Sequence, residues 1–228
     1  MKKYDPKPDA MTLREIDRQI AKRTDNIEKE FRGGFDFIKN CDRSVTIFGS
    51  ARTEEDDPDY KKAYSLGKKI SQDLGYSIIT GGGPGIMEAG NRGSFENGGG
   101  SLGLTIKLPF EQVINPYMSS YYDFHYFFAR KTCMTFAAEA YVYFPGGFGT
   151  LDELFEVLTI VQTQKTGRRP IILVGEKFWK PLDAFIREHL LDKAKISPED
   201  LDLYTITDDE DEIIEIIRKA KVYQTTDE

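Results

Sequence analysis

The stretch that decides the fold is AYVYFPGGFGTLDE, residues 140–153. Its first five residues form an apolar run of the length and composition typical of a buried strand. The run ends in the Pro-Gly-Gly turn at 145–147, and a helical pattern follows from Thr150 to Gln164. A strand that passes through a glycine-rich turn into a helix is half of a βαβ unit, so this stretch predicts a parallel sheet.

The same alternation extends in both directions from this stretch. Further strands are predicted at 44–49, 76–80, 101–106, 122–128, 170–174 and 203–206. Helices are predicted between them at 58–74, 86–97, 130–138, 178–190 and 208–223. Few hairpin signals interrupt the pattern. The expected fold class is α/β, a Rossmann-like three-layer fold with a mostly parallel sheet and helices on both faces, whose ligands bind beyond the carboxyl ends of the strands.

A charged helix is predicted ahead of the first strand, from Thr12 to Arg32, and we expect Gly33-Gly34 to form its C-cap. Its apolar residues follow helical spacing, so the helix packs either across the domain or against a second subunit. We therefore divide the chain into an N-terminal helical extension, residues 1–40, and a single Rossmann-like nucleotide-binding catalytic domain, residues 41–228.

The composition narrows the classes of partner. A net charge of −7 argues against binding to a nucleic-acid backbone, although backbone N–H groups can still hold a small anion. The N-terminus turns polar at once, without the apolar segment of a signal peptide, and no apolar run approaches the length of a membrane helix. The two cysteines have no metal-type or redox spacing. We expect a cytoplasmic protein without a nucleic-acid or membrane partner.

The first glycine-rich loop is Gly81-Gly82-Gly83-Pro84-Gly85, with Glu88 on the helix that follows. Consecutive glycines let the backbone approach a ligand closely, and the next helix points its free N–H groups at an anion. The loop matches neither the dinucleotide fingerprint nor the P-loop pattern. A tight turn that needs glycine only for close packing is the alternative.

The second glycine-rich loop lies within the opening stretch. The N–H groups of Gly146, Gly147, Gly149 and Thr150, with the Thr150 hydroxyl, could form a phosphate cradle. Glu153 has two interpretations. Thr-x-x-Glu is the capping-box pattern, in which the carboxylate only returns to the cap N–H. A functional Glu153 would have to face away from the phosphate, toward a sugar.

Arg130-Lys131 is the third candidate, at the start of a predicted helix. A solvated basic pair is the ordinary interpretation. Cations near a helix N-terminus are mildly unfavourable, however, and an anionic ligand at the same sheet edge would supply a reason for them. His125 and His189 have no partner at a metal-type spacing, so we expect no metal site and no cofactor.

Together these loops resemble the Lonely Guy (LOG) family, the cytokinin riboside 5′-monophosphate phosphoribohydrolases, many of which were first labelled possible lysine decarboxylases. The family pattern, an Arg-Lys pair followed by Pro-Gly-Gly-x-Gly-Thr-x-x-Glu, stands here at 130–131 and 145–153. Residues 81–88 are similar to the family's Gly-Gly-Gly-x-x-Gly-(Leu/Ile)-Met loop. The resemblance runs from about Ser44 to Phe185.

This resemblance implies hydrolysis of the N-glycosidic bond of a nucleoside 5′-monophosphate, giving free base and ribose 5-phosphate. It assigns Glu153 to the sugar and the attacking water, and Arg130 to orienting the nucleotide and easing departure of the base. The expected substrate- and phosphate-binding residues are Gly82, Gly83, Glu88, Lys131, Gly146, Gly147, Gly149 and Thr150. The alternative is a non-catalytic nucleotide- or phosphate-ligand-binding module on the same fold, because fold does not imply function.

One segment departs from the family pattern. Plant-type members place Met-His-Glu before their Arg-Lys pair, whereas this chain has Phe127-Phe128-Ala129. Because the segment helps shape the base pocket, AMP-like nucleotides are as strong candidates as cytokinin ribotides. The resemblance also implies a homodimer or higher homo-oligomer. The lysine decarboxylase label has no support, since no lysine has a recognisable context for binding pyridoxal phosphate.

Overall fold

The parallel sheet predicted from the sequence is the centre of the molecule. The computed structural model describes residues 12–39, 41, 43–108 and 113–220. Within these residues, seven strands form one sheet in the order β4-β3-β2-β1-β5-β6-β7, and every neighbouring pair is parallel. The strands are β1 (Ser44–Phe48), β2 (Ser77–Thr80), β3 (Ser101–Ile106), β4 (Ser120–Phe124), β5 (Ala140–Tyr143), β6 (Ile171–Leu173) and β7 (Thr205–Ile206).

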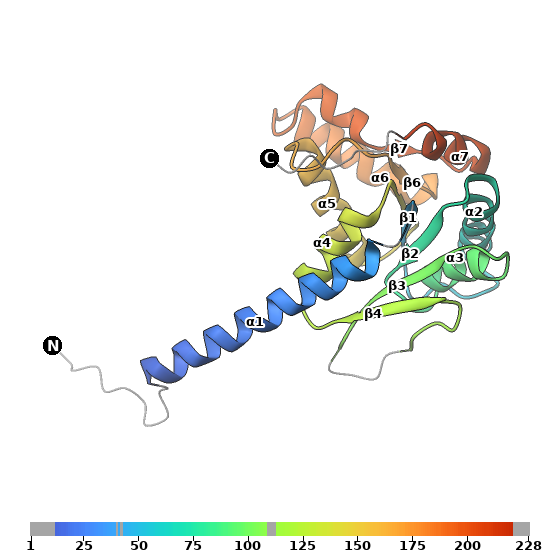
Figure 1. Ribbon diagram of the computed structural model, residues 1–228. Coiled ribbons are helices and arrows are strands. Elements are labelled where there is room, and N and C mark those ends of the chain that lie inside the picture. The colour runs from blue at the N-terminus through green and yellow to red at the C-terminus, as the bar shows by residue number, and fades with distance from the viewer. Residues whose placement is uncertain (1–11, 40, 42, 109–112, 221–228) are drawn as a thin grey trace.

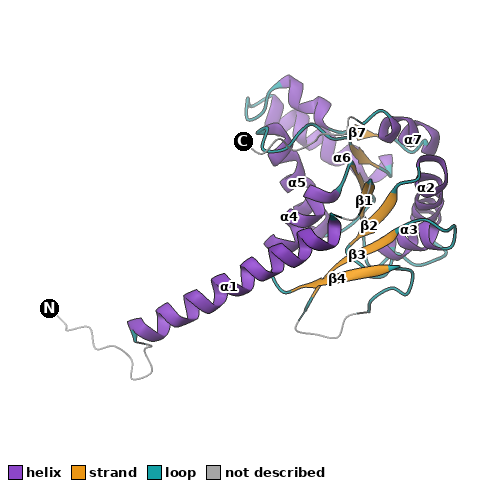
Figure 2. Ribbon diagram, viewed as in Figure 1, coloured by secondary structure: helices purple, strands orange, loops and turns teal. Residues whose placement is uncertain are grey.

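Helices cover both faces of the sheet, which confirms the Rossmann-like three-layer class (Figures 1 and 2). One face carries α2 (Pro58–Leu74), α3 (Ile86–Phe95) and α7 (Glu210–Arg218). The other carries α1 (Leu13–Ile38), α4 (Phe127–Ala137), α5 (Phe148–Gln162) and α6 (Glu176–Phe185). The π-helical turn η1 (Ile186–Leu191) continues α6, and the 3₁₀ helix η2 (Pro198–Leu203) precedes β7.

The central strands show why the sheet needs two helical layers. All four residues of β5 are buried, and they alternate between the two cores. Tyr141 and Tyr143 face α4 and α5, whereas Ala140 and Val142 face the layer of α2, α3 and α7. β1 pairs in register with β5, Val45 opposite Ala140, and is equally buried. Near-continuous apolar runs of this kind require cover on both sides.

The N-terminal helix is longer than predicted. A capping box between Thr12 and Glu15 begins α1, but the helix runs through Gly33-Gly34 to Ile38, so the predicted C-cap at these glycines was wrong. The two glycines serve close packing instead. A Cβ on Gly34 would lie 2.7 Å from the Cys133 sulfur, and one on Gly33 would overlap the Tyr122 hydroxyl.

The two halves of α1 differ in their contacts. The C-terminal half packs on α4 and β4, and the ring of Phe35 lies 5.2 Å from that of Phe136. Residues 12–26 are all exposed, and Figure 1 shows this half projecting away from the sheet. The predicted division of the chain at residue 40 stays a prediction.

Other boundaries moved by a few residues. The segment predicted as a strand at 122–128 is divided, since β4 ends at Phe124 and α4 already begins at Phe127. The helix predicted to begin at Phe178 begins at Glu176, and Trp179 is fully buried with its indole N–H bonded to the Val174 carbonyl at 3.0 Å. The last residues of the predicted final helix, 221–223, lie outside the described residues. None of the described helices combines the length and apolar character needed to cross a membrane.

Candidate active site

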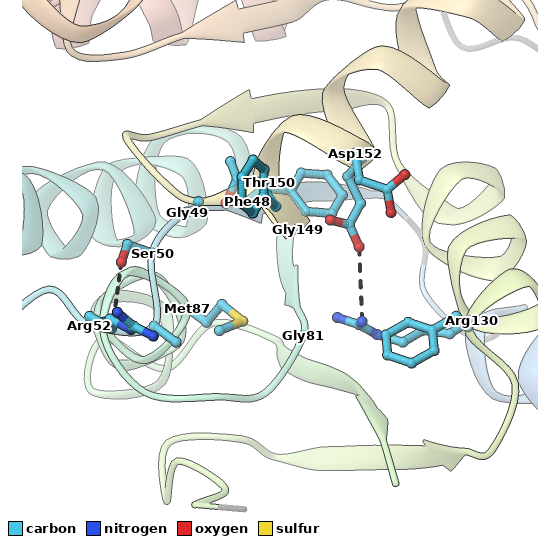
Figure 3. A pocket seen from close by; sticks show the side chains of 15 residues that line it. Phe48, Gly49, Ser50, Arg52, Gly81, Met87, Arg130, Gly149, Thr150 and Asp152 are labelled. Carbon is cyan, nitrogen blue, oxygen red and sulfur yellow. Dashed lines mark hydrogen bonds and ion pairs between the residues drawn. The ribbon is translucent and has the colours of Figure 1, made fainter. Parts of the chain in front are cut away.

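A cavity of about 590 Å³ lies at the carboxyl ends of β1 and β5 (Figure 3). The chain builds the sheet outward from β1 to β4 and then crosses to the other side of β1 to add β5. The cavity therefore sits at the point where the strand order reverses, where open α/β sheets bind their ligands. Its size lies within the usual range of about 300–1,000 Å³ for small-molecule sites.

The first glycine-rich loop is held mainly by bonds to the protein itself. The N–H of Gly82 donates to the Thr80 hydroxyl at 2.9 Å. Asn115 donates from its backbone N–H to the Gly82 carbonyl and from its side-chain amide to the Gly83 carbonyl, both at 3.0 Å. Gly82 has φ +73°, a conformation that favours glycine. These bonds come from residues outside the cavity lining, and they hold the loop without any ligand.

The end of this loop packs against the backbone of Ser50. Gly85 has φ +69°, and a Cβ there would overlap the carbonyl oxygen of Ser50. The same carbonyl accepts the N–H of Ile86, the first residue of α3, at 3.0 Å. One of the N–H groups that a helix N-terminus normally offers to an anion is thus already used. Within the loop, Gly81 alone lines the cavity.

The second glycine-rich loop is open. Gly147 is the N-cap of α5 and no side chain caps the helix, so the N–H groups of Phe148, Gly149 and Thr150 have no intrahelical partner. A Cβ on Gly147 would meet nothing within 4 Å, and one on Gly149 only the Glu153 carboxylate at 4.0 Å. Gly147, Gly149 and Thr150 line the cavity, while Gly146 packs against the Thr150 side chain outside it. The loop presents a helix N-terminus to the cavity.

Glu153 does not belong to a capping box. The alternative suggested by Thr-x-x-Glu is wrong, because Thr150 lies inside α5 and is not its N-cap. Glu153 is one turn further along the helix, and its Oε1 lies 3.9 Å from Nη1 of Arg130. A dashed line marks this ion pair at the labelled Arg130 in Figure 3. That separation is too long for a hydrogen bond, so both groups can still form hydrogen bonds with a ligand.

Arg130 is the buried cation of the site. It is 9% exposed, and its Nε donates to the Leu104 carbonyl of β3 at 2.7 Å. This bond aims the guanidinium end at the cavity, where it lies so close to Gly81 that a Cβ there would overlap Nη2. Burial lowers the pKa of Arg130 and the Glu153 carboxylate opposes that shift, but a guanidinium remains protonated at neutral pH.

Burial also raises the pKa of the Glu153 carboxyl above its ordinary value. The positive charges of Arg130 and Lys131 lower it, whereas the neighbouring carboxylates Asp152 and Glu156 add to the rise. The backbone of Glu153 is fixed from the sheet, because the Tyr143 hydroxyl donates to its carbonyl at 3.2 Å. A carboxyl group with a raised pKa in a cleft is a typical candidate for acid–base chemistry.

The remaining predicted residues lie outside the cavity lining. Glu88 accepts a hydrogen bond from the Tyr60 hydroxyl at 3.0 Å. Lys131 turns away from the cavity, and its Nζ contacts the carboxylates of Asp152 and Glu156 on α5. The structure thus brings together Arg130, Gly147, Gly149, Thr150 and Glu153, and it places Gly82, Gly83, Glu88, Lys131 and Gly146 behind or beside them.

Sequence reasoning missed the wall formed after β1. Residues 48–52 line the cavity opposite Arg130, and the Ser50 hydroxyl accepts the backbone N–H of Arg52 at 3.1 Å (Figure 3). Gly49 directly after the central strand was the available signal, since the carboxyl end of that strand borders the switch point. The apolar residues Met87 and Phe148 were also missed as cavity residues, whereas Phe127 belongs to the segment that the resemblance assigned to the base pocket. In the described part of the chain, no group of His, Cys, Asp and Glu residues is placed to hold a metal ion.

Fold and cavity together define a Rossmann-like protein in which an open helix N-terminus, suited to anions, adjoins a guanidinium–carboxylate pair. The family model described as "Possible lysine decarboxylase" matches residues 87–217, more than half of the chain. The protein therefore belongs to this family, the LOG family, as the sequence motifs predicted.

The individual relatives share less than a quarter of their residues with this chain. A cytokinin riboside 5′-monophosphate phosphoribohydrolase from Rhodococcoides fascians is 24% identical over 158 residues, which cover 68% of this chain and 79% of that protein. A molybdenum cofactor binding protein from Rippkaea orientalis superimposes with a TM-score of 0.58, at 22% identity, over 77% of this chain and 95% of its own. The molybdenum cofactor carrier protein of Chlamydomonas reinhardtii gives 0.56, at 23% identity, over 78% and 97%. At such identities the structural matches establish the fold.

Proposed function

We propose that this protein hydrolyses the N-glycosidic bond of nucleoside 5′-monophosphates, cytokinin ribotides or AMP-like nucleotides, to free base and ribose 5-phosphate. The observation that carries the proposal is the Arg130–Glu153 pair facing one cavity beside the open N-terminus of α5. A nucleoside monophosphate has a dianionic end for the helix and a sugar that becomes cationic during cleavage. The site offers a complementary group for each.

In the proposed reaction the C1′–N bond breaks and its electron pair leaves with the base. Water adds its oxygen to C1′, and one of its protons goes to Glu153, which has to be ionised beforehand. That proton then passes through water to the departing nitrogen, so the base leaves neutral and Glu153 is ionised again. The carboxylate also stabilises the oxocarbenium character of the sugar. Arg130 orients the nucleotide and eases departure of the base by stabilising the negative charge that develops on it. The buried position of Arg130 strengthens this interaction, because less water screens it.

The phosphate end is assigned to α5. The first-turn N–H groups of Phe148, Gly149 and Thr150 point toward the helix N-terminus, where the helix dipole also favours negative charge. Glu153 lies about one turn further along α5. If the phosphate binds at the helix N-terminus, the ribose lies between the phosphate and the Glu153 carboxylate. This placement meets the requirement that Glu153 face the sugar and not the phosphate.

The base end is assigned to the apolar part of the cavity. Met87 and Phe127 line it from α3 and α4, and the ring of Phe48 stacks on Tyr143 at 4.7 Å beneath it. Phe127 is 53% exposed, so a flat base can cover one of its faces. Phe128 packs on α1 instead, with its ring 6.2 Å from that of Phe31. The departure from the plant-type pattern thus contributes one aromatic side chain to the cavity.

Chromatographic detection of free base tests the proposal directly. The purified protein is incubated with AMP, GMP, CMP, UMP and isopentenyladenosine monophosphate, and the Glu153→Gln variant is treated alongside. We expect base release by the wild type that is lost in the variant, and a rank order among the substrates. No release from any of them by a folded protein would overturn the proposal.

The second candidate is a non-catalytic binding module. It is favoured by the likeness in fold to the molybdenum cofactor binding protein and the molybdenum cofactor carrier protein described above. A module of this kind would use the N-terminus of α5 for the phosphate of its ligand without turnover. One experiment distinguishes the two functions. Nucleotide would raise the melting temperature in both cases, but a binding module would release base only at the background rate.

We also propose that the protein forms a homodimer or higher homo-oligomer. The projecting half of α1 supports this, since Leu13, Ile16 and Ile20 are 80%, 39% and 58% exposed along one helical stripe. Light scattering of the full chain is expected to give at least twice the monomer mass. A monomer with full activity would contradict the proposal.

A further inference from the structure

Two adjacent residues of α4 meet three carboxylates of α5. Arg130 faces Glu153 inside the cavity. Lys131 lies next to it and contacts Asp152 and Glu156, with 2.9 Å from Nζ to Glu156 Oε2. Successive helical residues differ by about 100° in direction, so one member of the pair enters the cavity and the other turns along its side. The contacts to Asp152 and Glu156 therefore tie the two helices together beside the reacting pair.

The burial of Lys131 points to more than a surface ion pair. Its side chain is 13% exposed, whereas those of Asp152 and Glu156 are 62% and 37% exposed. Lysine is rarely so buried unless it is paired, because removing its charge from water is costly. Burial lowers the pKa of Lys131, but the hydrogen bonds to Asp152 and Glu156 outweigh it, so the pKa lies above its ordinary value and the side chain stays charged.

The charges around Glu153 come from each element packed against it. Arg130 and Lys131 approach from α4, Asp152 and Glu156 lie on α5 itself, and β5 supplies the neutral Tyr143 hydroxyl. Two cations thus face three carboxylates. Without Lys131, Arg130 alone would oppose the three negative charges.

We propose that Lys131 is a positioning residue: it fixes α4 against α5 so that Arg130 and Glu153 face each other, and it compensates the charges of Asp152 and Glu156. This role rests on the proposed function for its consequence in turnover, but the geometry and the titration of Glu153 exist without substrate. We propose this role in place of the direct phosphate contact expected from the sequence, because Lys131 lies outside the cavity lining.

Three variants test the proposal. Lys131→Met removes the charge, Lys131→Arg keeps it, and Glu156→Gln removes a neighbouring carboxylate outside the cavity lining. The first readout is the pKa of the Glu153 carboxyl by carbon-13 NMR of the ligand-free protein. The second is the acidic limb of the pH profile of kcat/KM for base release from AMP.

We expect Lys131→Met to raise the pKa of Glu153 by about one unit or more, the effect of losing an opposite charge nearby. The acidic limb should move to higher pH by the same amount. Lys131→Arg should restore both readouts, and Glu156→Gln should lower the pKa. If Lys131→Met does not fold, the other two variants still decide: Lys131→Arg should keep the wild-type pKa of Glu153 and Glu156→Gln should lower it, and a raised pKa in either would overturn the proposal.

An unchanged titration of Glu153 in Lys131→Met would overturn the positioning role. A rise in KM for AMP without a shift in the pH profile would also overturn it, in favour of a phosphate contact. Should the protein release no base, the NMR titration still gives its answer, so failure of the proposed function and failure of this inference are distinguishable.

Discussion

The two glycine-rich loops look alike in sequence but play different parts in the structure. Both follow a parallel strand and precede a helix at the same sheet edge. In residues 81–85, Gly82 and Gly85 have positive φ angles, and bonds to Thr80, Asn115 and Ser50 hold the loop in place. In residues 146–149, Gly147 and Gly149 have space around them, and the N–H groups of the following helix remain open. Gly82 and Gly85 in the first loop serve the fold, whereas Gly147 and Gly149 in the second leave access to a ligand.

Glu153, on the helix that follows the second loop, should be the position most sensitive to substitution. Glu153→Gln should lower the turnover number for base release by about a hundredfold to a thousandfold, the usual cost of removing one group that stabilises transition-state charge. The melting temperature should change little, because the amide has the same shape as the carboxyl group. Base release and thermal unfolding measured on the same preparation give both results.

Wild-type-like turnover in Glu153→Gln would contradict a catalytic role for Glu153. Glu176→Gln at the start of α6 is the matched control. Glu176 is a surface carboxylate that pairs with Lys180 and lies outside the cavity lining. This variant should keep the turnover of the wild type.

The next effect concerns the first loop. Gly85→Ala should lower the free energy of unfolding by about 2–4 kcal/mol, because φ +69° is unfavourable for alanine and the new Cβ overlaps the Ser50 carbonyl oxygen. Urea denaturation measures the change. Gly147→Ala is the matched control, since its Cβ meets open space, and it should stay within about 0.5 kcal/mol of the wild type. Equal losses in the two variants would contradict the assignment of different roles.

A smaller effect separates stability from binding within the second loop. Gly149 lies in the first turn of α5 without a positive φ, so Gly149→Ala should raise the free energy of unfolding by about 0.5–1 kcal/mol. The same methyl group would stand between the helix N-terminus and a phosphate. We expect AMP affinity, measured by calorimetry, to fall by roughly tenfold, the loss of about one hydrogen bond to a charged group. Unchanged affinity would place the phosphate elsewhere.

The sequence predicted the layers and the order of elements because burial of apolar runs and glycine-rich ends of strands are local signals. It predicted Arg130, Glu153 and the open loop through the family motif. It placed both Arg130 and Lys131 at the ligand, whereas only Arg130 lines the cavity, since the direction of each side chain depends on where α4 begins, and that boundary was misplaced by three residues. The same limit applies to Gly33-Gly34, where the partners that demand glycine, Tyr122 and Cys133, are distant in sequence.

The smallest expected effect is a pH dependence of stability at Glu153. The pKa of its carboxyl is raised in the folded protein above the ordinary value of 4.5, chiefly by burial. Between these two values the folded state binds more protons at this site than the unfolded state, so stability falls as pH rises. This contribution is fully present below pH 4.5 and is lost as pH rises through the folded pKa. Glu153→Gln lacks it at every pH.

The measurement is urea unfolding of both proteins between about pH 4 and pH 8, taken as the difference between wild type and Glu153→Gln so that the other titrating groups cancel. The wild type should lose stability relative to the variant as pH rises, and the difference should level off above the folded pKa. A difference that grows in favour of the wild type would mean that Arg130 outweighs burial. The pair would then be a stabilising ion pair, and the second loop would share the structural role of the first.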